Sequence, residues 1–228
     1  MASFARRQLV YALGSALAVL GWAGSAAATE PQRLIDRARL AIDEFHDDPN
    51  FTGMKVYLQN AYGVLIFPEL LKAGLLVGVQ VGSGVMVLRD PKSGTWGEPT
   101  FYDMYEGSFG LQIGGAATSA VFTLMNPGAI DKILANRFKI GTDASVAAGP
   151  IGPGVGAGTT ARFGEDIYLF SRSRGLYGGL SVDGAAILPK TDWNRAYYGV
   201  NATPAQIMRD HSASNAGTAQ LKESLARF

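Results

Sequence analysis

The chain contains no cysteine and only 2 histidines among its 228 residues. The lack of cysteine excludes a disulfide framework, a thiolate metal site and a cysteine nucleophile, and two histidines are too few for most histidine-rich metal sites. An excess of one charge is missing as well, because 20 Lys and Arg residues stand against 19 Asp and Glu residues. This near-neutral charge argues against a nucleic-acid partner, which needs a basic stripe.

Apolar residues, at 47%, and glycine, at 29 residues, are abundant. The apolar content excludes a disordered chain, and the length fits a single domain. Glycine is nearly twice as frequent as its usual share of about 7%. We expect glycines inside strand-like runs to mark bulges and tight bends where a sheet curls.

Catalytic and cofactor motifs are weak throughout. The Gly-rich run 149–158 lacks the Lys-Ser/Thr ending of a phosphate-binding loop, and its two prolines remove amide donors. Gly107-Ser108-Phe109-Gly110 resembles a nucleophile elbow, yet Glu106 stands where that motif has its first glycine. The sequence therefore predicts no enzyme, no catalytic residues, no metal and no cofactor.

The first 28 residues have the order of a secretory signal peptide. Arg6 and Arg7 form a basic start, an apolar run over 9–22 follows, and small residues lead to a cleavage position between Ala28 and Thr29. The alternative is an uncleaved anchor, but the run is shorter than the ~20 residues of a spanning helix. We expect export to the periplasm, by the general or the twin-arginine route, with peripheral attachment to a membrane.

The mature chain, 29–228, begins with a predicted helix over 32–45. Thr29 can cap this helix, with Gln32 as its capping-box partner. Apolar residues recur at helical spacing from Leu34 to Phe45, and most charged residues lie off this stripe. A shorter helix over 54–60 is predicted next.

From residue 61 onward, short uncharged runs replace the helical period. The runs 73–88 and 108–125 are apolar on both faces, and Asp183-Gly184 favours a hairpin turn in which both residues take positive φ. Strands at this spacing, without long helices between them, predict antiparallel pairing. We expect one α+β domain, in which N-terminal helices cover a curved, mostly antiparallel β-sheet that is either open or closed into a barrel-like form.

Eight stretches of the sequence occur in an order and spacing that resemble the SYLF domain, a lipid-binding domain also described as the yeast-type actin-binding domain. The resemblance covers about residues 33–210, which is nearly the whole mature chain. The stretches are 61–68 (AYGVLIFP), 72–74 (KAG), 82–85 (GSGV), 96–101 (WGEPTF), 107–114 (GSFGLQIG), 143–150 (DASVAAGP), 173–179 (SRGLYGG) and 194–199 (NRAYYG).

The resemblance implies a non-enzymatic domain that binds phospholipid or a membrane surface. Eukaryotic members bind phosphoinositides, in part through an N-terminal amphipathic helix, and some bind and bundle actin, whereas bacterial members are mostly exported proteins without an assigned role. This sequence departs from the actin-binding pattern, because it carries a signal peptide and no Lys-rich extension before the domain. Phospholipid is therefore the expected partner, actin is not expected, and a protein partner stays unspecified.

The predicted N-terminal helix supplies the first candidates for lipid contact. Leu34 and Ile35 could enter the bilayer while Arg33, Arg37 and Arg39 lie near lipid phosphates. The alternative is an ordinary helix that packs on the sheet.

Three further cations are candidates outside this helix. Lys72 could meet a phosphate at the mouth of a cavity that holds acyl chains, or be a surface lysine beside a strand. Arg172 and Arg174 point to the same side of an extended segment and could act as a pair, or lie in a solvated turn.

Two other classes of function stay open. A periplasmic scaffold would bind a protein partner, and exposed aromatic residues such as Tyr197 and Tyr198 would then matter. An outer-membrane β-barrel fits charge-poor strands after a signal peptide, although barrel strands should alternate apolar and polar residues over about 10 positions. The runs 73–88 and 108–125 do not alternate in this way.

Overall fold

A computed structural model of the chain describes residues 29–228 with five internal gaps, and the structural statements below concern the described residues. The predicted signal peptide, 1–28, and most of the Gly-rich run 149–158 lie outside them. The gaps are 75–76, 110–113, 137, 153–163 and 176–181.

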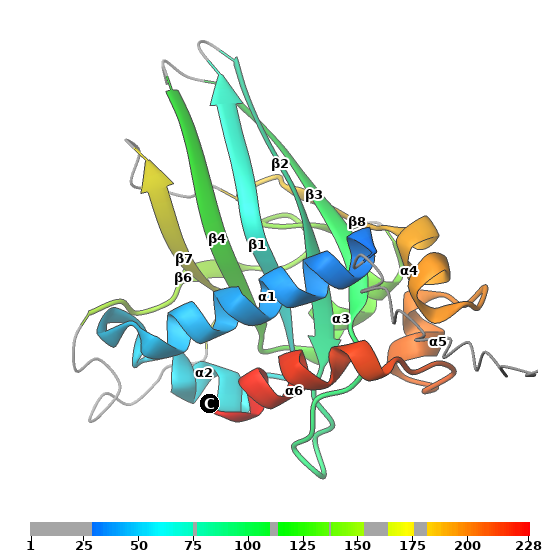
Figure 1. Cartoon of the computed structure of the whole chain (residues 1–228). Coiled ribbons are helices and arrows are strands. Elements are labelled where there is room, and N and C mark those ends of the chain that lie inside the picture. Colours follow the sequence, from blue (N-terminus) through cyan, green and yellow to red (C-terminus); the bar gives the residue numbers. More distant parts are fainter. Residues whose placement is uncertain (1–28, 75–76, 110–113, 137, 153–163, 176–181) are drawn as a thin grey trace, which may run out of the picture.

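The described residues form one eight-stranded sheet that curls into a half-barrel (Figure 1). The strand order is β5-β8-β3-β2-β1-β4-β7-β6, and every pairing is antiparallel except the parallel pair of β6 and β7. This confirms the predicted α+β class with a curved, mostly antiparallel sheet. The strands are β1 (Gly63–Gly74), β2 (Val77–Leu88), β3 (Thr100–Phe109), β4 (Gly114–Leu124), β5 (Phe138–Lys139), β6 (Val146–Ala148), β7 (Ile167–Gly175) and β8 (Ala186–Pro189).

Helices cover part of this sheet. The first helix, α1, crosses one face of the sheet, and the last helix, α6, runs beside α1 (Figure 1). The predicted N-terminal helices are therefore confirmed. The helices are α1 (Glu30–Asp47), α2 (Met54–Asn60), α3 (Pro127–Leu134), α4 (Thr191–Tyr198), α5 (Pro204–Met208) and α6 (Ala219–Ala226), with 3-10 turns at Pro49–Phe51 and Ala216–Thr218.

The start of α1 shows how tertiary contacts modify a local motif. The Thr29 side chain accepts a hydrogen bond from the Gln32 amide at 3.4 Å, as predicted for a cap. The Gln32 side chain does not complete a capping box, however. It donates to the Gly217 carbonyl at 3.1 Å and accepts from the Tyr197 hydroxyl at 2.7 Å. Contacts with the C-terminal segments therefore replace the local bond.

The sheet buries an apolar cluster on each of its faces, as the uncharged runs predicted. Ile35 of α1 packs with Val85 and Phe170 in one buried cluster, on the α1 side. Phe67 and Ile133 belong to a second cluster on the opposite side, which α3 covers. Two separate cores explain why strands β1, β2 and β4 carry so few charges.

Glycine permits the curl near the middle of β1. The register of β1 shifts between Ile66 and Leu71 where it pairs with β2. At Gly84, a Cβ atom would lie 2.5 Å from both the Ile66 carbonyl oxygen and the Phe67 ring. Gly84 lies opposite this register shift, so the expectation that strand glycines mark bulges is confirmed at this position.

The predicted turn geometry at Asp183-Gly184 is wrong, whereas the strand expected before it, from 176 on, lies largely outside the described residues. Of the two residues, only Gly184 has positive φ, at 82°. The Gly184 amide donates to the Ile140 carbonyl at 2.9 Å, and the strand that follows, β8, pairs with β3 and β5. Pairing partners far away in the sequence therefore fix this turn.

Candidate functional site on the outer face of the sheet

An apolar area on the α1 side of the sheet stays open to solvent. Val81 of β2 lies on the same face as Val85, which is buried in the cluster with α1, because residues four apart in a strand share a face. Leu71 of β1 and Tyr105 of β3 are directly opposite Val81 in the two neighbouring strands. We define the outer strip as these three residues and Val79. Their exposed fractions are 51% for Leu71, 53% for Val79, 37% for Val81 and 47% for Tyr105.

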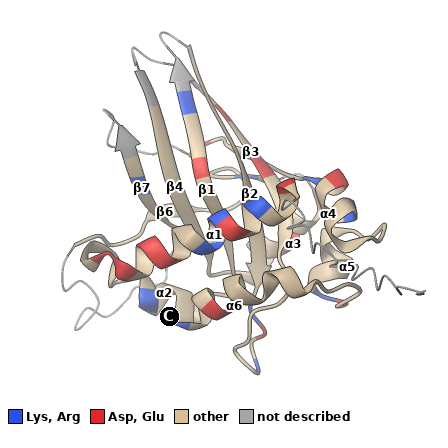
Figure 2. Cartoon of the chain, viewed as in Figure 1, with Lys and Arg blue, Asp and Glu red and all other residues tan. Residues whose placement is uncertain are grey.

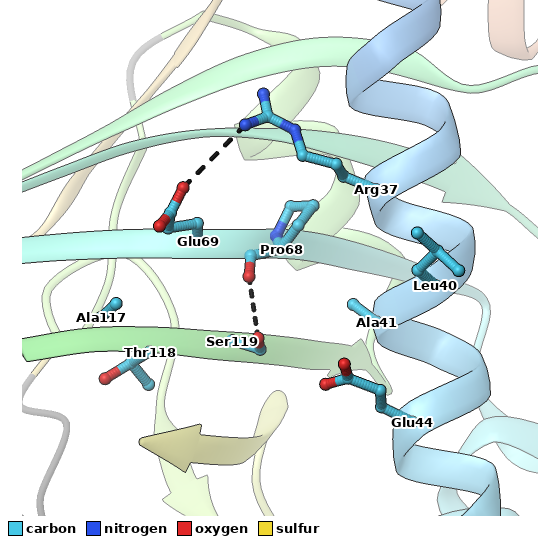
Figure 3. A pocket seen from close by; sticks show the side chains of 9 residues that line it. All are labelled: Arg37, Leu40, Ala41, Glu44, Pro68, Glu69, Ala117, Thr118 and Ser119. Carbon is cyan, nitrogen blue, oxygen red and sulfur yellow. Dashed lines mark hydrogen bonds and ion pairs between the residues drawn. The ribbon is translucent and has the colours of Figure 1, made fainter. Parts of the chain in front are cut away.

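A groove of about 220 Å³ lies beside this strip, where the exposed side of α1 meets β1 and β4 (Figure 3). Leu40 of α1 is 50% exposed at its edge. The Ser119 hydroxyl donates to the Pro68 carbonyl at 2.8 Å across its floor. Because Ala117 is directly opposite Leu71, the groove continues into the outer strip. The lining residues are Arg37, Leu40, Ala41, Glu44, Pro68, Glu69, Ala117, Thr118 and Ser119.

Acidic side chains occur along the whole of α1, whereas its last two turns carry no Lys or Arg (Figure 2). The arginines predicted to meet lipid phosphates all have carboxylate partners. Arg33 pairs with Glu30 one turn away. Arg37 Nη1 lies 3.9 Å from Glu69 Oε2 on β1. These pairs place negative charge beside each positive charge. The third arginine, Arg39, has its Nη1 2.8 Å from an oxygen of Asp43.

A second charged group lies on the same face, towards β8. Lys190 Nζ donates to Asp103 Oδ1 and to Ser83 Oγ, both at 3.1 Å, and lies 4.1 Å from the centroid of the Trp193 ring. Ser83 in turn donates to Asp103 at 2.6 Å. The Asp103 charge, followed by burial, raises the pKa of the Tyr105 hydroxyl.

The predicted insertion of the α1 stripe into lipid is incompatible with the folded state. Leu34 and Ile35 are each 1% exposed and belong to the core beneath α1. The helix therefore packs on the sheet, which was the alternative interpretation. Their contact with a bilayer would require α1 to leave the sheet.

Of the three other predicted cations, Lys72 lies in β1, whereas Arg172 and Arg174 lie two residues apart in β7. Lys72 follows Leu71 in β1 and so points to the opposite face of the sheet, where it is half-buried. Arg172 Nη1 is 2.8 Å from Glu44 Oε2 of α1, and Arg172 Nε is 3.7 Å from Asp48. Both Arg172 and Arg174 lie in β7, which corrects the solvated-turn alternative, but the Arg174 side chain lies outside the described part. Lipid binding by these residues stays a prediction.

The aromatic residues suggested for a protein partner are not exposed. Tyr197 is 9% exposed and its hydroxyl donates to Gln32, while the Tyr198 hydroxyl donates to the Pro99 carbonyl. Burial, followed by the nearby Glu98 charge, raises the pKa of both hydroxyls. These tyrosines attach α4 to the rest of the fold.

Ser108 lies inside β3, directly opposite Gly78, so its backbone is an extended strand and not the strand-to-helix turn of a nucleophile elbow.

Within the described ranges, His, Asp and Glu form no group of three or more that could hold a metal ion. Among the described helices, none is long and apolar enough to cross a membrane.

Sequence reasoning missed the outer strip. Val79, Val81 and Tyr105 alternate with residues of the other face, which is the local signal of a half-covered strand. The sequence does not reveal where α1 stops covering the sheet, however. An exposed valine such as Val81 and a buried one such as Val85 therefore have the same local sequence pattern.

The fold and the outer strip define a one-sheet α+β domain with an open apolar face. A family model, Ysc84, described as a Las17-binding protein actin regulator, matches residues 105–228. The chain therefore belongs to the Ysc84 family, which confirms the resemblance to the SYLF domain.

Curated relatives agree with this membership. Protein YSC84 of Saccharomyces cerevisiae is 36% identical over 154 residues, which cover 66% of this chain and 32% of that protein. LAS seventeen-binding protein 3 of the same species is 36% identical over 154 residues, covering 66% of this chain and 33% of its own length. The human SH3 domain-containing YSC84-like protein 1 is 28% identical over 142 residues, covering 62% and 41%. The matched region thus spans only about a third to two fifths of these relatives.

Proposed function

We propose that the chain is a non-enzymatic domain that attaches to a phospholipid membrane surface through the outer strip. The supporting observation is the strip itself, in which apolar side chains from three adjacent strands stay exposed together. Isolated exposed apolar residues are ordinary, whereas a contiguous group is typical of an interaction surface.

The size of the strip favours a membrane over a second copy of the chain. Four half-exposed side chains present at most a few hundred Å², whereas a stable protein interface buries about 800 Å² on each partner. Insertion of each side chain into a bilayer contributes about 1 kcal/mol, so the four contribute about 4 kcal/mol. That corresponds to a Kd of about 1 mM and to reversible attachment.

Vesicle co-sedimentation tests this function, with vesicles of phosphatidylethanolamine and phosphatidylglycerol. Replacing Leu71, Val79 and Val81 together by Thr keeps side chains that suit a strand and removes apolar surface. We expect at least a tenfold loss of binding. The control is Val200→Thr, because Val200 has the same 37% exposure as Val81 but lies between α4 and α5. Equal binding by the folded triple variant, or no binding by the folded parent chain, would contradict the proposal.

We also infer that the chain is exported to the periplasm, on the basis of its N-terminal sequence. The test is N-terminal sequencing of the protein from a periplasmic fraction, and the expected first residue is Thr29. An exported chain does not meet cytoplasmic actin, although the family description refers to Las17 binding and actin regulation. We therefore expect the chain to stay in the supernatant when actin filaments are sedimented, and pelleting with the filaments would overturn this expectation.

A further inference from the structure

We infer that the outer strip binds loosely packed bilayers through its apolar surface. It should bind anionic lipids only slightly better than zwitterionic lipids. This inference rests on the proposed membrane function and concerns the class of lipid. The charges that border the strip decide this lipid class, because a preference for anionic lipid requires basic side chains that are free to approach phosphates.

On the side nearest α1, the strip is bordered by two opposite charges that lie side by side. Arg37 and Glu69 have side chains that are 50% and 49% exposed, with 3.9 Å between Nη1 and Oε2. Glu69 precedes Leu71 by two residues in β1 and lies on its face. An approaching anionic lipid therefore meets a carboxylate about as close as the guanidinium group, and the attraction is largely cancelled.

On the opposite side, the bordering cation is also engaged. Ser83 and Asp103 form the cross-strand pair next to Val81 and Tyr105. Lys190 donates to both of them and lies over the Trp193 ring. The Lys190 side chain is only 23% exposed and its charge is opposed by the Asp103 carboxylate, so the pair adds little positive potential above the strip.

Among the described strands, β1 and β7 carry two more cations to consider near the strip. Lys72 points to the other face of the sheet, away from Leu71. Arg174 can be placed by register alone: it is opposite Ala117, which is opposite Leu71. One arginine near a surface changes anionic-lipid affinity by about fivefold, which is small beside the roughly thousandfold effect of the four apolar side chains.

Apolar insertion without charge attraction favours bilayers with gaps between their head groups, as in amphipathic packing sensors. Unsaturated phosphatidylethanolamine provides such gaps and carries no net charge. An open apolar strip whose bordering cations each lie beside a carboxylate thus matches this lipid class.

The test compares vesicles of dioleoyl phosphatidylcholine and phosphatidylethanolamine with the same vesicles containing phosphatidylglycerol, at low and high salt. For the parent chain we expect affinities within fivefold of one another and little change with salt. The informative variant is Glu69→Gln, which releases Arg37. We expect it to raise binding to the anionic vesicles about fivefold at low salt and to leave binding to neutral vesicles unchanged.

The matched control is Asp131→Asn, which releases Arg209 on the side of the sheet that α3 covers. It should not change binding to either kind of vesicle, and Arg174→Ala should change anionic binding by no more than fivefold. A preference of the parent chain for anionic vesicles above tenfold, abolished by salt, would overturn the inference but leave the proposed function intact. So would a Glu69→Gln variant without effect. If the folded chain binds neither kind of vesicle, the proposed function itself fails.

Discussion

Arg172 on β7 and Glu44 on α1 form an ion pair with 2.8 Å between Nη1 and Oε2, although they are 128 residues apart in the chain. Asp48, at the end of α1, lies 3.7 Å from the same guanidinium group. The pair joins the C-terminal half of the helix to the edge of the sheet. An arginine that the sequence offered as a phosphate ligand therefore has a structural position in the fold.

This position predicts a small effect of Arg172→Ala on stability. Both side chains are more than one third exposed, so we expect a loss of about 0.5–1 kcal/mol in the free energy of unfolding. Vesicle binding should stay within twofold. Urea unfolding and co-sedimentation measure the two effects, with Arg195→Ala as the control, since Arg195 lies 4.0 Å from the exposed Asp192. Loss of vesicle binding by the folded variant would restore Arg172 as a lipid contact.

A pair of leucines on α1 tests whether the helix stripe belongs to the core or to the membrane. Leu34 is 1% exposed and Leu40 is 50% exposed. We expect Leu34→Glu to lower the free energy of unfolding by at least 3 kcal/mol, because a buried apolar group is lost and a charge is buried (about 2–5 kcal/mol for the apolar part alone). Leu40→Glu should cost less than about 1 kcal/mol. A Leu34→Glu variant with unchanged thermal unfolding and lost vesicle binding would instead support the membrane interpretation.

Substitutions at two strand glycines, Gly84 and Gly107, test whether close packing at a strand position requires glycine. The added Cβ of Gly84→Ala would meet the Ile66 carbonyl at 2.5 Å, and backbone cannot move aside as a side chain can. We expect a loss of about 2–3 kcal/mol. At Gly107, no atom lies within 4 Å of the added Cβ, so Gly107→Ala should change stability by less than about 0.5 kcal/mol. Equal unfolding midpoints of the two variants would show that Gly84 is not needed for the curl.

We expect the Asp166 carboxylate to contribute to the free energy of unfolding in a way that depends on pH. The Ser145 amide, followed by the Asn126 side chain, donates to its carboxylate and holds the pKa of Asp166 below its usual value. A carboxyl whose pKa is lowered by folding stabilises the protein above its unfolded pKa of about 4, and this contribution is lost as pH falls through the folded value. We therefore expect Asp166→Asn to be less stable than the parent chain by about 1 kcal/mol at pH 7.

Chemical unfolding at a series of pH values checks this prediction. The difference between Asp166→Asn and the parent chain should shrink as pH falls below about 4. Asp192→Asn is the control, because that side chain is 94% exposed. A difference that stayed constant down to pH 2 would show that the lost hydrogen bonds, and not the charge, account for the effect.

The sequence by itself determined the elements whose signals are local. The apolar period from Leu34 to Phe45 predicted α1, the uncharged runs predicted strands with two buried faces, and the stretches in fixed order predicted the family. These predictions succeeded because a helical or strand period depends on neighbours within a few residues, whatever the rest of the chain does.

The tertiary structure alone decided which apolar residues are covered and which cations are free. Leu34 and Leu71 are both apolar in periodic segments, yet one is 1% and the other 51% exposed, because α1 ends its coverage of the sheet between them. Arg37 and Arg172 acquire carboxylate partners from β1 and α1 only when distant segments meet. Coverage and ion pairing are relations between segments far apart in the chain, so no local pattern encodes them, and the surface open to a partner emerges only from the folded sheet.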